Sequence, residues 1–193
     1  MTIEACPRTS DGRLNHNLAM PLLINTPRYT LRIDGLGIQT HDELLAGETD
    51  RSWKYVPHDH DALEEIAGRL GWAAREQRTW TYGALVKDVT FCIPSINEGK
   101  PYLPNMDVSG DTVVRRKDLE VVDEFLTYLS LHSYKEADVI ASALVTGPAT
   151  GKPNAEFLRL ARKFRRATPR FTPDTELWAR ELQHNYNYFA NLK

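Results

Sequence analysis

The chain is poor in cysteine and lacks any long apolar run. Two cysteines, Cys6 and Cys92, are too few for a disulfide framework, so we expect free thiols in a reducing compartment. Residues 1–20 lack the apolar core of a signal peptide, and no run approaches the roughly 18 apolar residues of a membrane span. We therefore expect a cytoplasmic protein with no membrane partner.

The chain also lacks an excess of either charge. It has 24 Lys and Arg against 26 Asp and Glu, so the formal net charge is only -2. This overall balance indicates neither nucleic acid nor a membrane as a partner. Any such partner must be inferred from a local cluster of charged residues. A sequence of 193 residues with 41% hydrophobic residues is long enough to bury a core without a metal ion or disulfides.

The sequence divides near residue 57. Prolines and glycines punctuate residues 1–56, which we expect to form an irregular N-terminal arm or small subdomain, with a short strand around residues 29–33. Residues 57–193 show the regular periodicity of a folded domain. The sequence contains no internal repeat and no low-complexity tract.

Helix signals dominate residues 57–193. Asp61 is predicted to cap a first helix, whose apolar residues recur at helical spacing from Leu63 to Ala74. Thr81 follows a short β-prone step and is predicted to cap a second helix. Residues 91–110 contain three prolines and two glycines and are predicted to form a loop. A longer helix is expected over residues 115–132.

The C-terminal third begins with an apolar run at residues 138–146, which predicts a buried strand that ends in a turn from Gly147 to Pro153. A helix capped by Asn154 should follow over residues 154–166. A last helix should start at Thr172-Pro173 and bury the apolar stripe of Trp178, Leu182, Tyr186 and Phe189. The order of elements predicts an α+β, mostly helical domain with a winged-helix-like core.

Two stretches carry a family resemblance. They are Thr79-Trp80-Thr81-Tyr82-Gly83-Ala84-Leu85 and the run from Ala137 to Pro153. They resemble the "TYGELA" and "LPPLTALVVNKxTGxPG" motifs of a family of uncharacterised bacterial and phage domains, some of which lie beside HNH nuclease domains. The resemblance implies a role in DNA metabolism or phage defence. Ala84 and Glu136-Ala137 depart from that family's pattern.

The Thr81-Tyr82-Gly83 step is also similar to the winged-helix DNA-binding domain of alkylguanine alkyltransferases. Those enzymes carry a Pro-Cys-His-Arg nucleophile motif on the following strand, whereas this chain has no cysteine after Cys92. Alkyl transfer is therefore excluded.

Local charge provides the main functional signal. Seven basic residues and one acidic residue, Glu156, give residues 152–170 a net charge of +6. With a second cluster at the start of the predicted long helix, they form a candidate surface for nucleic acid or an acidic protein. The candidate residues are Arg115, Arg116, Lys117, Lys152, Arg159, Arg162, Lys163, Arg165 and Arg166. Alternatively, these side chains form a solvated helix face or neutralise neighbouring acidic residues.

Other possible sites are incomplete. The run from His58 to Asp61 contains metal-binding residue types but has no second cluster to complete a site. Asp88, Glu98 and Lys100 resemble the carboxylates and lysine of a metal-dependent nuclease, although nearby prolines argue against the required strand. We predict no catalytic residues, no metal site and no cofactor.

The sequence thus favours a non-enzymatic nucleic-acid-binding or regulatory module of a bacterium or phage. One alternative is a protein-interaction module, such as a phage inhibitor of a host defence complex. A metal-dependent nuclease is the second alternative.

Overall fold

The computed structural model describes residues 52–106, 116–147, 151–165 and 172–191. This part of the chain is mostly helical and contains a small two-stranded sheet, which confirms the α+β, mostly helical prediction. The strand expected around residues 29–33 lies outside the described residues, as does most of the predicted N-terminal arm.

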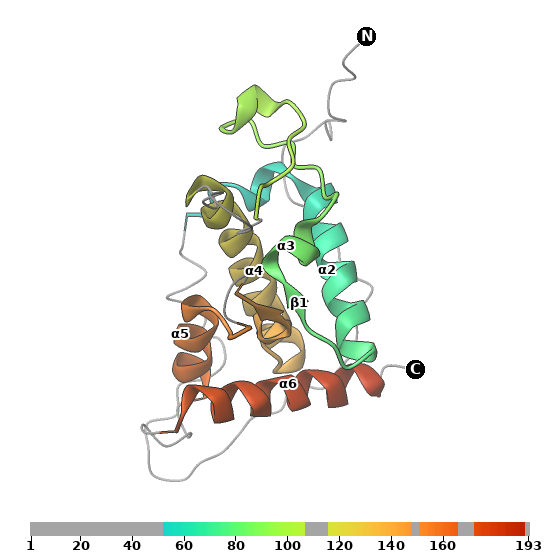
Figure 1. The fold of residues 1–193 in the computed structure, drawn as a ribbon, viewed down its shortest axis with the longest axis vertical. Helices are drawn as coiled ribbons and strands as arrows, with labels where there is room; N and C mark the ends of the chain where they lie inside the picture. Colours follow the sequence, from blue (N-terminus) through green and yellow to red (C-terminus); the bar gives the residue numbers. More distant parts are fainter. Residues whose placement is uncertain (1–51, 107–115, 148–150, 166–171, 192–193) are drawn as a thin grey trace.

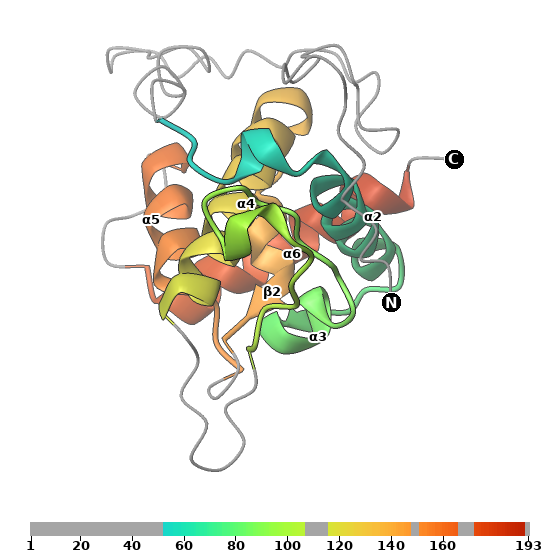
Figure 2. The same cartoon turned by 90° about the horizontal axis from the view of Figure 1, so that it is seen from above.

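Four helices form the framework. The central helix α4 (Arg116–Ala137) lies between α2 (His60–Arg75) and α5 (Ala155–Phe164), which are on opposite sides of the molecule (Figures 1 and 2). Helix α6 (Asp174–Ala190) crosses the lower ends of the other three in Figure 1. α4 is five residues longer at its C-terminal end than the predicted helix 115–132.

The apolar interior contains two clusters. The larger one joins α2, the first half of α4 and the short elements around α3 (Tyr82–Val86), with Phe91 and Phe125 fully buried in edge-to-face contact. The smaller one joins the end of α4 to α5 and the start of α6, where Tyr134 stacks on Phe164 at 4.2 Å between ring centroids. Thus α2 and α5 pack against different parts of α4.

The first helix is capped by Asp59 and not by Asp61. Asp59 precedes α2, and its Oδ1 accepts the backbone N–H of Ala62 at 3.1 Å while Oδ2 accepts that of Cys92 at 2.5 Å. Asp61 instead lies in the first turn and is exposed. Burial raises the pKa of Asp59 despite the opposing effect of these two N–H donors. Asp59 therefore ties the start of α2 to the segment after α3.

Two other predicted caps are confirmed and one is wrong. Thr81 accepts the N–H of Ala84 at the start of α3, and Asn154 accepts that of Phe157 at the start of α5. Pro173, rather than Thr172, occupies the N-cap position of α6 and makes no side-chain cap bond.

The predicted strand over residues 138–146 is confirmed only at its end. Ala141–Leu144 forms a 3-10 helix, η3, and only the last two residues form a strand, β2 (Val145–Thr146). Serines of α4 accept its backbone N–H groups: Ser133 Oγ accepts Ala141 N at 3.2 Å, and Ser130 Oγ accepts Ser142 N at 2.9 Å. Side chains thus satisfy buried donors that a strand would give to its sheet.

The winged-helix arrangement is not confirmed. A wing is formed by an antiparallel hairpin, whereas β2 pairs in parallel with β1 (Trp80–Thr81). An isolated antiparallel bridge between Thr146 and Pro153 closes the predicted turn. The predicted loop at 91–110 includes a short 3-10 helix, η2 (Asn97–Gly99), and an antiparallel bridge between Phe91 and Tyr102.

The buried stripe of α6 differs from the prediction at every position except Phe189. It consists of Leu177, Glu181, Asn185 and Phe189. Leu182 and Tyr186 are only partly buried, and so is Trp178, whose indole N–H donates to the carbonyl of Ala143 at 2.8 Å. Two polar residues occupy the buried stripe because they bond to other polar groups there.

The residues just before position 57 belong to the folded core. Tyr55 and Val56 are buried at the start of η1 (Val56–His58), where Tyr55 is the N-cap residue. Glu124 Oε1 accepts the N–H groups of Lys54, Tyr55 and Val56 at 2.5–3.1 Å. This carboxylate of α4 anchors the incoming chain.

The expectation of free thiols is wrong for Cys92, which is disulfide-bonded. Cys6 is the only other cysteine of the sequence and lies outside the described residues. Cys92 therefore no longer supports the prediction of a reducing compartment.

Candidate functional site

Two predicted basic residues of α5 form ion pairs at the surface. Arg159 Nε bonds to Glu156 Oε2 at 2.9 Å. Arg162 reaches the start of α6, where its Nη2 bonds to Asp174 Oδ1 at 2.5 Å and to the carbonyl of Thr172 at 3.1 Å. Exposed ion pairs contribute about 0–1 kcal/mol, so phosphate could replace either carboxylate. Here, however, both charges are compensated by the protein.

Arg165 is largely buried between two carboxylates and stabilises the fold. Its guanidinium contacts Asp138 Oδ1 at 2.5 Å and Glu181 Oε1 at 2.7 Å, and it lies 5.3 Å from the centre of the Tyr134 ring. Burial alone would lower its pKa, but bonds and charges from Glu181 and Asp138 outweigh burial and raise it. Because the side chain is only 18% exposed, little of it can reach an external ligand.

The remaining predicted basic residues differ in exposure. The Arg116 side chain is 93% exposed and bonds to Glu120 at 3.0 Å, while Lys117 Nζ donates to the carbonyl of Ser95 at 3.3 Å. Lys152 is exposed and Lys163 is half-buried. Arg115 and Arg166 lie outside the described residues.

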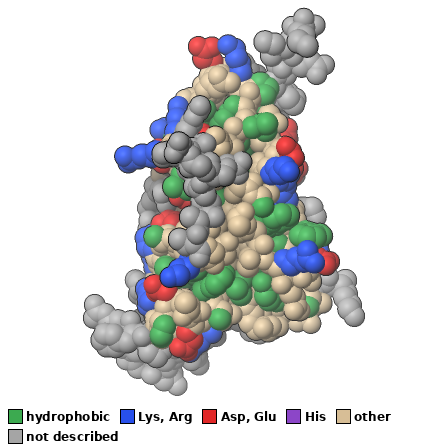
Figure 3. Space-filling view, in the orientation of Figure 1, with side chains coloured by type: hydrophobic (Ala, Val, Ile, Leu, Met, Phe, Trp, Pro, Cys, Tyr) green, Lys and Arg blue, Asp and Glu red, His purple; other side chains and the backbone are tan. Residues whose placement is uncertain are grey.

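The α4–α5 side of the molecule consequently has mixed charge. Figure 3 shows blue and red side chains along its left edge, over the elements that Figure 1 labels α4 and α5. The structure brings predicted basic residues to one side but places carboxylates among them.

A different surface combines exposed aromatic and basic residues at the C-terminal end of α2. Trp72, on α2, is one of two large hydrophobic residues that are exposed among the described residues, at 42%. Its ring lies 5.4 Å from that of Trp80, with a tilt of 38° between them. We call Trp72, Trp80, Arg75 and Arg78 the α2–β1 surface.

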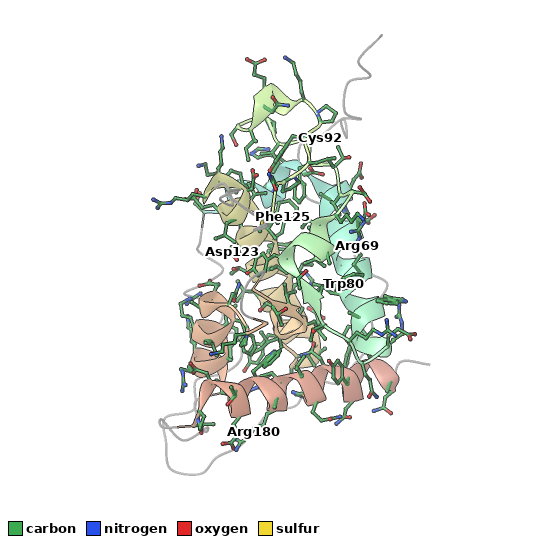
Figure 4. The ribbon with its side chains drawn as sticks, viewed as in Figure 1. Arg69, Trp80, Cys92, Asp123, Phe125 and Arg180 are labelled. Atoms are coloured by element: carbon green, nitrogen blue, oxygen red, sulfur yellow. The ribbon has the colours of Figure 1, made fainter. Side chains whose placement is uncertain are left out.

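Trp80 is the partly buried member of this surface and is held by a hydrogen bond. Its indole N–H donates to the carbonyl of Arg69 at 3.0 Å, and it packs against the larger core cluster. Arg69 itself donates to the carbonyls of Leu85 and Lys87 at 2.8 and 2.7 Å. Figure 4 shows Arg69 and Trp80 on the same side of the molecule, beside α2 and β1.

Arg75 and Arg78 provide the charge of the α2–β1 surface. Both are exposed, and neither forms an ion pair with another described residue. Arg75 follows Trp72 by three residues, which places both on one side of α2. Glu76 reduces the local charge, but two arginines against one glutamate leave residues 75–78 positive. On the face in Figure 3, hydrophobic side chains adjoin basic ones along the right edge.

A polar cluster joins the first stretch of the family resemblance, at the start of α3, to α4 and to the start of α5. The Tyr82 hydroxyl donates to Asp123 Oδ1 at 2.5 Å, and the Asn154 amide donates to both Tyr82 and Asp123. Burial, followed by the charge of Asp123, raises the pKa of Tyr82. A phenol with a raised pKa stays protonated at neutral pH, so this cluster supports a structural connection between α3, α4 and α5.

The alternative metal sites do not assemble in the described part of the chain. Across residues 52–106, 116–147, 151–165 and 172–191, no three His, Cys, Asp or Glu side chains gather as metal ligands would. Glu98, in the 3-10 helix η2, bonds at 3.1 Å to Lys100, the residue that follows this helix, and neither residue lies on a strand. None of the helices that the structure describes has the length and apolarity to cross a membrane.

Sequence reasoning missed the α2–β1 surface, although a signal was present. The predicted apolar stripe of α2 includes Leu70 and Ala74, and Trp72 lies outside it. A tryptophan off the buried stripe, three residues before an arginine, is the pattern that could have identified this surface. Its contact with Trp80 could not be predicted because it depends on where the chain returns after α2.

Comparison of the chain with protein-family models, curated proteins and solved structures found no match.

Proposed function

We propose that the protein is a non-enzymatic nucleic-acid-binding module, and that the α2–β1 surface is its main contact. The supporting observation is the exposure of Arg75 and Arg78, which have no ion-pair partner among the described residues, beside two tryptophans. Arginine guanidinium groups bind phosphate through charge-assisted hydrogen bonds. Such a partner fits a role in a bacterium or phage.

The α4–α5 side is a secondary contact in this proposal. Arg116 is exposed enough to reach a phosphate, and the surface ion pairs of Arg159 and Arg162 are weak enough to exchange. The same charges would also attract an acidic protein surface, which is the alternative partner.

Fluorescence anisotropy with labelled oligonucleotides at several salt concentrations tests the proposal. Each phosphate contact to a single strand contributes about -0.7 to the slope of log K against log salt. Arg75→Glu together with Arg78→Glu should therefore make the slope shallower by about 1.4, for two lost contacts. The matched control, Arg116→Glu with Lys117→Glu, should change it less. Wild-type protein that binds neither oligonucleotides nor heparin at low salt would contradict the proposal.

A further inference from the structure

The α2–β1 surface has the chemistry to read an unpaired base as well as a phosphate. The exposed Trp72 ring has an aromatic support behind it in Trp80, which is itself fixed by a hydrogen bond to α2. A rigid aromatic ring next to cationic side chains is the combination by which proteins hold single-stranded nucleic acid. Duplex bases are already stacked on one another and offer no free face to such a ring.

Gly68 keeps the surface beside Trp72 clear. It lies four residues before Trp72, and helical side chains lean toward the N-terminus, so a side chain at 68 would lie next to the tryptophan ring. Glycine disfavours a helix interior relative to alanine. Neither a positive φ nor close packing requires it here, since an added Cβ would meet nothing within 4 Å. The glycine thus leaves room beside an exposed ring.

We propose that the α2–β1 surface binds single-stranded nucleic acid by stacking a base on Trp72 while Arg75 and Arg78 contact the flanking phosphates. This inference rests on the proposed function and narrows its ligand class. It commits to a single strand because the surface offers an exposed ring together with two arginines that have no ion-pair partner among the described residues. A protein partner that used only the ring would not need the arginines.

The test compares three probes on the full-length protein: a labelled oligothymidine, a duplex of the same length, and heparin. Wild-type protein should bind the single strand more tightly than the duplex. Trp72→Ala should weaken oligothymidine binding by at least about fivefold, the lower end for the loss of one stacked base, and leave heparin binding unchanged. Trp72→Phe should retain most of the affinity because it keeps an aromatic face.

Two further variants make the test independent of folding defects. Gly68→Gln keeps Trp72 but fills the space beside it, so it should also weaken oligothymidine binding and spare heparin binding. Leu103→Ala is the matched control: Leu103 is the other exposed large hydrophobic residue, at 59%, and lies in the loop before α4. It should bind all three probes like the wild type.

The outcomes separate the two proposals. If wild-type protein binds no polyanion, the proposed function fails, and this inference fails with it. If Trp72→Ala binds oligothymidine like the wild type while reversal of Arg75 and Arg78 weakens all three probes, only base stacking is overturned. Tighter binding to duplex than to single strand would also overturn it. Base stacking would also be overturned if sedimentation showed that the wild-type protein is a dimer and that Trp72→Ala is a monomer. The α2–β1 surface would then bind a second copy of the chain.

Discussion

Helix α5 and the end of α2 both carry arginines, but the two regions use them differently. On α5, Arg159 and Arg162 are paired at the surface and Arg165 is enclosed by Asp138 and Glu181. At the end of α2, Arg75 and Arg78 are exposed without such partners among the described residues. In the more basic sequence segment, the arginines that the structure describes are therefore the ones whose charge the fold compensates. Charge density along the chain does not measure the charge that is available to a ligand.

The largest effect should come from the enclosed arginine. Arg165→Ala leaves Glu181, whose side chain is 5% exposed, as a buried carboxylate without its main partner. Breaking such a pair costs about 3–5 kcal/mol. Chemical denaturation should show a fall of this size in the free energy of unfolding, and Arg165→Met with Glu181→Leu should recover much of it.

Arg159→Ala is the control on the same helix, and it removes an exposed ion pair that contributes about 0–1 kcal/mol. If Arg165→Ala lowered the free energy of unfolding no more than Arg159→Ala, the structural role of Arg165 would be wrong.

A smaller difference in the free energy of unfolding should distinguish Asp59 from Asp61. Asp59→Ala removes the cap of α2 and the acceptor for Cys92 N, which should lower the free energy of unfolding by about 1–3 kcal/mol. Asp61→Ala should lower it by no more than about 0.5 kcal/mol, because Asp61 is exposed. Equal losses in thermal or chemical denaturation would contradict the assigned cap.

The smallest effect on stability should come from the α2–β1 surface. Arg75→Ala together with Arg78→Ala removes exposed side chains that have no ion-pair partners among the described residues. The free energy of unfolding should therefore change by about 0.5 kcal/mol or less in chemical denaturation. A loss comparable to that of Arg165→Ala would show that these arginines also stabilise the fold, and the contrast between the regions would disappear.

The sequence predicted what depends on local pattern. Helical periodicity located α2, α4, α5 and α6, and the side-chain chemistry of Thr81 and Asn154 correctly identified two caps. These features depend on residues within a few positions of one another.

The errors arose where distant segments decide the structure. The run at 138–146 has the composition of a strand, yet serines of α4 accept two of its backbone N–H groups and four of its nine residues form η3. Asp59 is the cap in part because it also binds Cys92 N across 33 positions of sequence. The candidate site was missed for the same reason, since it needs the contact of Trp72 with Trp80.

The α2–β1 surface and α5 should contribute unequally to binding, because the arginines of α5 are paired with carboxylates. Binding of one labelled oligothymidine, measured in parallel for two charge-reversed proteins, distinguishes the two surfaces. Arg75→Glu with Arg78→Glu should weaken binding by at least about tenfold, the equivalent of about 1.4 kcal/mol. Arg159→Glu with Arg162→Glu should weaken it less, because those charges are already compensated. The opposite order, with the α5 variant losing more affinity, would show that α5 and not the α2–β1 surface is the main contact.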